Sequence, residues 1–167
     1  CNICYNENLD QKRLTLEKFE GLLKRLPRKA SFRILGGEPT IHPDFFEFVE
    51  LGRKYKHLMS VVSNGLMYSD GDFVQKITNN RGCSYAITLN GGLNMDHPAW
   101  RIIDNNSECG RVKLFGLRNL LHYGVKNIFL TAIIVRGVNE AIIRELHNFA
   151  MKYPKQISGI RFRSVGM

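Results

Sequence analysis

Residues 31–50 read SFRILGGEPTIHPDFFEFVE, and this stretch carries the signals of a strand, a turn and a helix in succession. The run 31–35 is short and apolar, which predicts a strand. After the turn, Phe45, Phe48 and Val49 recur at helical spacing. A strand followed at once by a helix is the unit from which parallel α/β folds are built.

The same unit repeats along the chain. Runs of strand length, rich in β-branched and aromatic residues, lie at 58–62, 84–89, 127–135 and 157–162. Apolar residues at helical spacing occur at 16–26 behind a Thr15 cap and before Pro27, at 114–121 before Gly124, and at 142–153. Alternation of five strands with about five helices predicts an α/β fold with one parallel sheet and right-handed crossovers. Five strands are too few for a complete eight-stranded barrel.

The length and composition favour a single compact domain over residues 1–167, because 167 residues with 44% apolar side chains can bury one core. The longest apolar segment, IFLTAIIV at 128–135, is far shorter than the roughly 20 residues that span a bilayer. The first residues are polar and do not resemble a secretory signal. We therefore expect no membrane span and a cytoplasmic, thiol-reducing location.

The formal net charge of +9 raises the question of a nucleic-acid partner. Most of the basic residues are spread over the expected helices and alternate with acids, which is typical of a solvated helix face. Only Arg161 and Arg163, at alternate positions of one expected strand, place two charges on a common face. A nucleic-acid substrate therefore stays possible but is not favoured.

Four expected strands end in glycine-bearing turns: GGEPT (36–40), SNG (63–65), NGG (90–92) and RGVNE (136–140). Parallel strands end at the same edge of a sheet, where α/β folds bind ligands. Glycine removes the Cβ and lets a ligand approach the main chain closely. Each turn also carries a polar side chain, namely Glu38, Asn64, Asn90 and Asn139. The pattern predicts one site shared by four turns, with the longer polar insertion 91–110 beside it.

Glu38 precedes Pro39, which biases it towards an extended conformation and directs its carboxylate away from the strand end. That carboxylate is suited to a ligand ammonium, or equally to the start of the next helix. His42 and Asp44 are interpreted mainly as turn and cap residues.

The chain begins CNIC, so Cys1 and Cys4 have the spacing of a metal or redox pair. A zinc site needs a second ligand pair, whereas Cys83 and Cys109 stand alone. In a thioredoxin-like protein the cysteine pair follows a strand. This requirement cannot be tested here, because the sequence starts at Cys1. An iron–sulfur cluster takes closely spaced cysteines on one loop, but two ligands cannot hold it. We expect Cys83 to be a small buried residue.

With GGEPT, SNG and RGVNE behind it, CNIC resembles the radical S-adenosyl-L-methionine (radical SAM) superfamily, whose signature is CxxxCxxC. Cys1 and Cys4 match its second and third cysteines, and the first would lie four positions before Cys1. Within the superfamily, the pattern is similar to molybdopterin-precursor synthases and to peptide-modifying, SPASM-type maturases. The resemblance implies a partial (β/α)6 TIM-like barrel in which strands two to six are present, in a core domain incomplete at both ends.

The resemblance also implies a 4Fe-4S cluster and SAM as cofactors, with Cys1 and Cys4 as metal ligands. Such enzymes cleave SAM reductively to a 5′-deoxyadenosyl radical that abstracts hydrogen from a substrate. We expect a small-molecule or peptide substrate, in peptide modification or cofactor biosynthesis, and an external electron donor of flavodoxin or ferredoxin type. Residues that select the substrate are expected within 91–110 and beyond Met167.

The implied cofactor-binding residues follow the turns. Gly36, Gly37 and Glu38 would hold the methionine ammonium of SAM. Ser63, Asn64 and Asn90 would hold its carboxylate and ribose. Val135, Arg136, Gly137 and Asn139 would border the nucleoside, and Val165 would close the adenine side.

Two other readings of the sequence stay open. The first is a non-catalytic α/β nucleotide or nucleic-acid-binding module in which the CxxC is incidental. The second is a thiol-redox protein in which Cys1 and Cys4 form a reversible disulfide.

Overall fold

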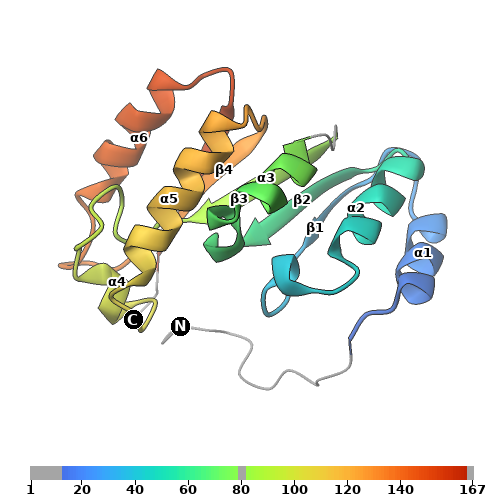
Figure 1. Cartoon of the computed structure of the whole chain (residues 1–167), viewed down its shortest axis with the longest axis horizontal. Helices are drawn as coiled ribbons and strands as arrows, with labels where there is room; N and C mark the ends of the chain where they lie inside the picture. The colour runs from blue at the N-terminus through green and yellow to red at the C-terminus, as the bar shows by residue number, and fades with distance from the viewer. Residues whose placement is uncertain (1–12, 79–81, 165–167) are drawn as a thin grey trace.

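The computed structural model describes residues 13–78 and 82–164. Its elements alternate along the chain (Figure 1). The strands are β1 (Ser31–Ile34), β2 (Leu58–Ser63), β3 (Cys83–Thr88), β4 (Ile128–Ile134) and β5 (Ile157–Ser164). The helices are α1 (Leu16–Arg25), α2 (Phe45–Lys54), α3 (Gly71–Thr78), α4 (Ala99–Ile102), α5 (Cys109–His122) and α6 (Ile142–Lys152), with 3₁₀ turns η1 (Pro39–Ile41) and η2 (Leu66–Ser69). The five predicted strands are confirmed, each boundary to within two residues.

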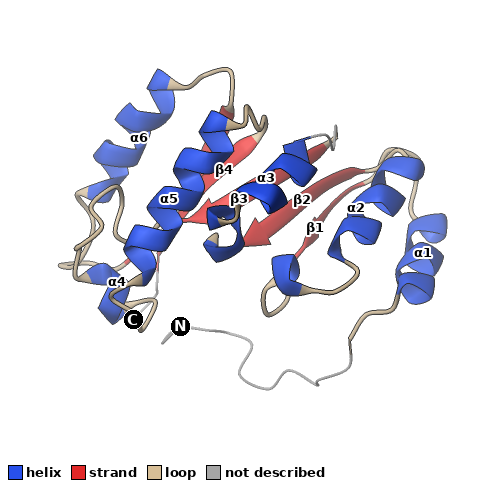
Figure 2. Cartoon of the chain, in the orientation of Figure 1, coloured by secondary structure: helices blue, strands red, loops and turns tan. Residues whose placement is uncertain are grey.

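The five strands form one parallel sheet in the order β1-β2-β3-β4-β5. Every crossover therefore moves one position in the same direction, as in a barrel, whereas a doubly wound sheet reverses its order. Successive crossovers of one hand place their helices on the same side, and Figure 2 shows the helices in front of the strands. The predicted parallel sheet and partial TIM-like barrel are confirmed.

The core lies between the sheet and this helix layer. Val61, Ile87 and Leu130, on neighbouring strands, are fully buried against it. Side chains alternate across a strand, so the intervening residues face the opposite side of the sheet. Those on β2, β3 and β4 include Ser60, Ser84, Thr88 and Thr131, which are only partly buried. We call this side, which carries polar groups and is not covered by the connecting helices, the open face.

The helix prediction was incomplete in two places. Helix α3 was not predicted, because it has only three buried apolar residues, Phe73, Val74 and Ile77. The Asp70 side chain stabilises the start of this helix by accepting hydrogen bonds from the amides of Asp72 and Phe73. The segment 91–110 is not a plain loop, since it contains α4 and the first two residues of α5. The predicted Thr15 cap is confirmed, because its side chain accepts a hydrogen bond from the Lys18 amide.

Within the described ranges 13–78 and 82–164, no helix combines the length and the apolar character needed to cross a bilayer.

Candidate functional site

All four predicted turns follow the carboxyl ends of parallel strands and therefore lie at one edge of the sheet. Direct contacts join the first turn to the second, the second turn to the end of β3, and the third turn to the fourth. Glu38 of the first turn bonds to Asn64 of the second, and Thr88 Oγ1 at the end of β3 donates to the Ser63 carbonyl. Asn139 of the fourth turn donates to the Asn90 carbonyl of the third. The predicted convergence of the turns is confirmed.

Glu38 has the extended backbone predicted from Pro39, with φ −138° and ψ 109°. Its Oε1 accepts from the Thr40 amide at 3.1 Å and from Thr40 Oγ1 at 2.5 Å, and its Oε2 accepts from the Asn64 amide at 2.6 Å. The expectation that this acid serves the next helix start is confirmed, because Glu38 caps η1. A carboxylate offers about four acceptor positions, so one position on Oε2 is left for a ligand donor.

Glycines at the edge fall into two groups. A Cβ on Gly65, which has φ +87°, would lie 2.5 Å from Cγ1 of Ile87, so packing and backbone both require glycine there. A Cβ on Gly36 or Gly37 would meet no described atom within 4 Å. With Glu38, these two glycines line a cavity of about 740 Å³. The positive φ of Gly36, +156°, already favours glycine at that position. Neither a positive φ nor packing against described residues accounts for Gly37, whereas a ligand held against the main chain fits it.

His42 lines the same cavity. Its Nδ1 accepts a hydrogen bond from the Asp44 amide at 3.1 Å, which confirms its role in the turn and leaves the proton on Nε2. Nε2 is buried and has no partner among the described residues. A buried donor without an acceptor is costly, so His42 is a candidate ligand residue that the sequence reasoning missed. Its position four residues after Glu38 was the available signal.

Ser63 and Asn64 shape the second turn. The buried Ser63 hydroxyl accepts from the Gly65 amide at 2.9 Å, and Asn64 Oδ1 accepts from the Leu66 amide at 2.9 Å. The amide nitrogen of the Asn64 side chain has no partner in the described part of the chain. Asn64 therefore has a donor to offer a ligand, whereas Ser63 mainly fixes the turn.

Asn90 and Asn139 are buried and tie the third turn to the fourth. Asn139 Nδ2 donates to the carbonyls of Asn90 and Ile133, both at 2.8 Å, and its Oδ1 accepts from the Val135 amide at 2.8 Å. Asn90 Oδ1 accepts from the Ile133 amide at 2.9 Å. Because both amide hydrogens of Asn139 are used, this side chain acts on the site through the backbone shape that it imposes.

The network continues into the 91–110 insertion. Asn90 Nδ2 donates to Asp104 Oδ2 at 3.0 Å, and Lys113 Nζ lies 2.7 Å from Asp104 Oδ1. The Lys113 side chain is only 2% exposed and lies over the Trp100 ring. A buried cation of this kind needs its partner, so the pair fixes the insertion to the edge. Sequence reasoning missed it, because Asp104 and Lys113 belong to different segments and match no spacing rule.

Val135 directly follows β4, and Arg136 and Gly137 lie in the fourth turn. The Val135 carbonyl accepts from the Val138 and Asn139 amides, and Gly137 takes φ +78° while its amide donates to Glu140 Oε1. Three other predicted site residues, Cys1, Cys4 and Val165, lie outside the described residues. Among the residues that are described, no group of three or more His, Cys, Asp or Glu side chains is placed to hold a metal ion.

Cys83 and Cys109 are free thiols, and both are buried. Burial raises the pKa of Cys83 to about 12 and raises the pKa of Cys109 as well. Cys83 begins β3, at the end of the strand opposite the turns, so its prediction as a small buried residue is confirmed.

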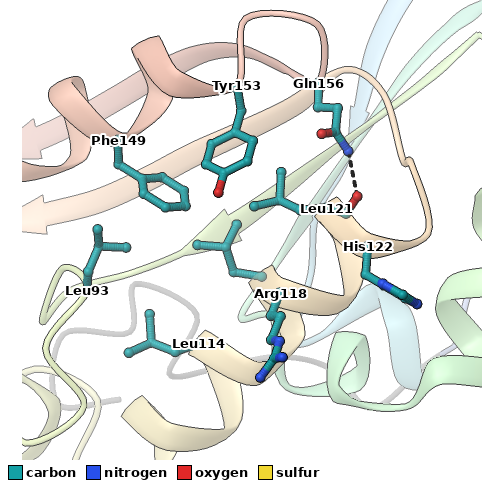
Figure 3. Close-up of a pocket in the computed structure, with 9 residues that line it drawn as sticks. Leu93, Leu114, Arg118, Leu121, His122, Phe149, Tyr153 and Gln156 are labelled. Atoms are coloured by element: carbon teal, nitrogen blue, oxygen red, sulfur yellow. Dashed lines mark hydrogen bonds between the residues drawn. The ribbon is translucent and has the colours of Figure 1, made fainter.

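A second cavity, of about 500 Å³, lies in the helix layer. Leu93, Leu114, Leu117, Leu121, Phe149 and Tyr153 supply its apolar lining (Figure 3). Gln156 Nε2 donates to the Leu121 carbonyl at 2.8 Å, and the side chains of Arg118 and His122 point away from Phe149 (Figure 3). None of the described residues that line this cavity is acidic, and none belongs to the four edge turns.

Comparison with known proteins adds a family match. The model of the radical SAM superfamily matches residues 1–150. Over 147 residues the chain is 24% identical to a 7,8-dihydro-6-hydroxymethylpterin dimethyltransferase of Methanocaldococcus jannaschii, covering 87% of this chain and 28% of that protein.

Solved structures show similar folds. Streptococcus suis SuiB bound to S-adenosylmethionine has a TM-score of 0.73 at 16% identity, over 96% of this chain and 36% of SuiB. SuiB bound to the precursor peptide SuiA has a TM-score of 0.69 at 18% identity, over 95% of this chain and 34% of SuiB. TYW1 with a lysine-pyruvate adduct has a TM-score of 0.61 at 23% identity, over 91% of this chain and 52% of TYW1. The chain therefore spans about a third to a half of these structures, and these likenesses show the fold alone.

Proposed function

The chain belongs to the radical SAM superfamily, and from that premise we propose that residues 1–167 are the core domain of an enzyme that cleaves SAM reductively. The observation that carries the proposal is the GGE turn. A Cβ on Gly37 would meet no described atom within 4 Å, so packing among the described residues does not explain this glycine, and Glu38 beside it keeps one acceptor position. A main-chain cradle next to a carboxylate suits the ammonium and carboxylate groups of an amino acid such as the methionine part of SAM.

The turns take the following proposed roles. Glu38 accepts a hydrogen bond from the SAM ammonium while Thr40 and Asn64 hold its carboxylate in place. Asn64 donates to the SAM carboxylate or ribose through its free amide nitrogen. Asn90 and Asn139 keep the ends of β3 and β4 in register, so that residues 135–137 border the nucleoside through their main chain.

Cys1 and Cys4 are the proposed cluster ligands, because thiolates are the usual ligands of iron–sulfur clusters. When bound, the cluster and SAM would supply the 5′-deoxyadenosyl radical that removes hydrogen from the substrate. The electron would come from an external flavodoxin- or ferredoxin-type donor. A cytoplasmic location stays a prediction, consistent with thiols that must remain reduced.

Two relatives indicate the proposed substrate classes. One SuiB structure contains a precursor peptide, and the M. jannaschii relative is named for methyl transfer to a pterin. We therefore propose peptide modification or cofactor biosynthesis as the setting, while the chain covers only part of either relative.

The test is anaerobic reconstitution of the full-length protein with iron and sulfide, followed by electron paramagnetic resonance of the reduced protein with and without SAM. We expect a cluster signal that SAM alters. Cys4→Ser should abolish the signal, and the matched control Cys83→Ala should retain it, because Cys83 is buried far from the turns. A reversible disulfide between Cys1 and Cys4 with no bound iron would instead establish the thiol-redox reading.

A further inference from the structure

Three arginines point to the open face of the sheet. Arg161 and Arg163 alternate along β5 and pair in register with Thr131 and Ile133 of β4. Arg33 of β1 pairs in register with Ser60, which places it on the same face. None of the five strands contains an aspartate or a glutamate. The open face is therefore positively charged along both of its outer strands.

A small cavity of about 90 Å³ opens on this face beside the carboxyl ends of the strands. Its polar lining comes from four residues, Thr88, Thr131, Arg161 and Arg163, and its apolar lining comes from Val62, Ala132 and Ile133. The two threonine hydroxyls lie 3.0 Å apart and donate to the Ser63 and Ile87 carbonyls. The cavity therefore combines two arginine side chains with two threonine hydroxyls that are held in place by hydrogen bonds. It lies next to the edge turns.

Among residues 13–78 and 82–164, the arginines of this cavity have no counterion. No carboxylate of the described residues lies within salt-bridge distance of Arg161 or Arg163, although Arg161 is partly buried. The Arg161 guanidinium lies 4.4 Å from the Phe129 ring centroid, and this contact restricts its orientation. Burial, followed by repulsion from Arg33 and Arg163, lowers the pKa of Arg161 below its ordinary value. Partly buried guanidinium groups are usually paired, so this cluster is electrostatically incomplete without an anion.

We propose that Arg161 and Arg163 bind an oxyanion of the substrate, a phosphate or a carboxylate, and so restrict the enzyme to acidic substrates. The inference rests on the proposed function, since it places the substrate beside the SAM turns. A guanidinium group presents paired donors that match both oxyanions, and the repeated positive charge favours the doubly charged phosphate. The 91–110 insertion was expected to select the substrate, and the open-face arginines would add a preference for negatively charged groups.

The experiment is isothermal titration of the reconstituted full-length protein with inorganic phosphate and, separately, with acetate. The test variant is Arg161→Gln/Arg163→Gln. The control, Arg118→Gln/Arg144→Gln, removes the same charge from exposed positions on α5 and α6. We expect phosphate affinity to fall about tenfold to hundredfold in the test variant and to stay within about twofold in the control. Tighter binding of acetate than of phosphate would assign the site to a carboxylate.

Two results would overturn the inference. Equal phosphate affinity in the wild type and the test variant would show that the arginines bind no oxyanion. Loss of phosphate binding in the presence of saturating SAM would assign the arginines to the cofactor carboxylate and not to a substrate. Either result can occur in a protein that still forms 5′-deoxyadenosine, so failure here is distinct from failure of the proposed function.

Discussion

Glu38 Oε2 accepts a hydrogen bond from the main-chain amide of Asn64 at 2.6 Å, across the ends of two neighbouring strands. The contact makes one carboxylate both a structural link between two turns and a candidate ligand for SAM. A glutamine side chain keeps one acceptor oxygen and has no charge, but its NH2 group must face either the Asn64 amide or the Thr40 donors. The two roles are therefore distinguished by comparing SAM binding with retention of the cluster.

Glu38→Gln should therefore weaken SAM binding about tenfold or more while sparing the cluster, since a hydrogen bond to a charged group contributes more than a neutral one. The measurements are the dissociation constant of SAM by titration and the visible absorbance of the reconstituted cluster. Equal loss of both signals would show that Glu38 is only a structural residue.

Gly37→Ala and Gly110→Ala form a second test. A Cβ on Gly37 meets no described atom, so we expect the free energy of unfolding to change by less than about 0.5 kcal/mol while SAM affinity falls. A Cβ on Gly110 would lie 2.3 Å from Trp100 Nε1, so overpacking should cost about 1–3 kcal/mol. Urea unfolding and SAM titration check both variants. Unchanged SAM affinity in Gly37→Ala would remove the argument for a main-chain cradle.

Lys113→Met should strongly destabilise the protein, because Asp104 would lose its cation and remain partly buried beside Asn90. Breaking such a pair typically costs about 3–5 kcal/mol, and Lys113→Met/Asp104→Asn should recover part of this loss. The coupling free energy from a double-mutant cycle in urea is the measurement. Additive effects of the two substitutions would show that the pair does not hold the insertion.

Cys83 predicts the behaviour of the protein at alkaline pH. The pKa of the Cys83 thiol is about 12 in the folded chain and near 9 in the unfolded chain. Its contribution to the free energy of unfolding is therefore complete below pH 9 and is lost as the pH rises towards 12. In that interval the unfolded chain binds fewer protons, and stability should fall by up to about 1.4 kcal/mol per pH unit. Burial also raises the pKa of Tyr68, which leaves a slope of the same sign in any Cys83 variant.

The matching measurement is the free energy of unfolding of the wild type and Cys83→Ala at about pH 8 and about pH 10.5. We expect the variant to be less stable at the lower pH because it lacks the buried sulfur, and the difference to narrow at the higher pH. A difference that stays constant would mean that the Cys83 thiol does not titrate on unfolding.

Local sequence signals were sufficient for the parts of the fold that depend on neighbouring residues. The five strands follow from short apolar runs, and the extended Glu38 follows from Pro39. Helix α3 was missed because its eight residues carry too short an apolar stripe to stand out. Parallel pairing then made the convergence of the four turns predictable, because it fixes which strand ends meet.

The partners of individual side chains were not predictable in the same way. Asn139 was expected to border the nucleoside, but its amide is used up by three main-chain groups at the ends of β3 and β4. The Asp104 and Lys113 pair depends on how the insertion folds back against α5, which no spacing in the sequence encodes. Tertiary contacts of this kind decide which polar groups remain free for a ligand.

The most direct test of the central claim is the formation of 5′-deoxyadenosine from SAM, measured by chromatography after anaerobic reconstitution and chemical reduction of the full-length protein. The account predicts reduction-dependent 5′-deoxyadenosine in the wild type, a strong decrease in Glu38→Gln and none in Cys4→Ser. A reconstituted protein that binds its cluster and SAM yet forms no 5′-deoxyadenosine under reduction would contradict it.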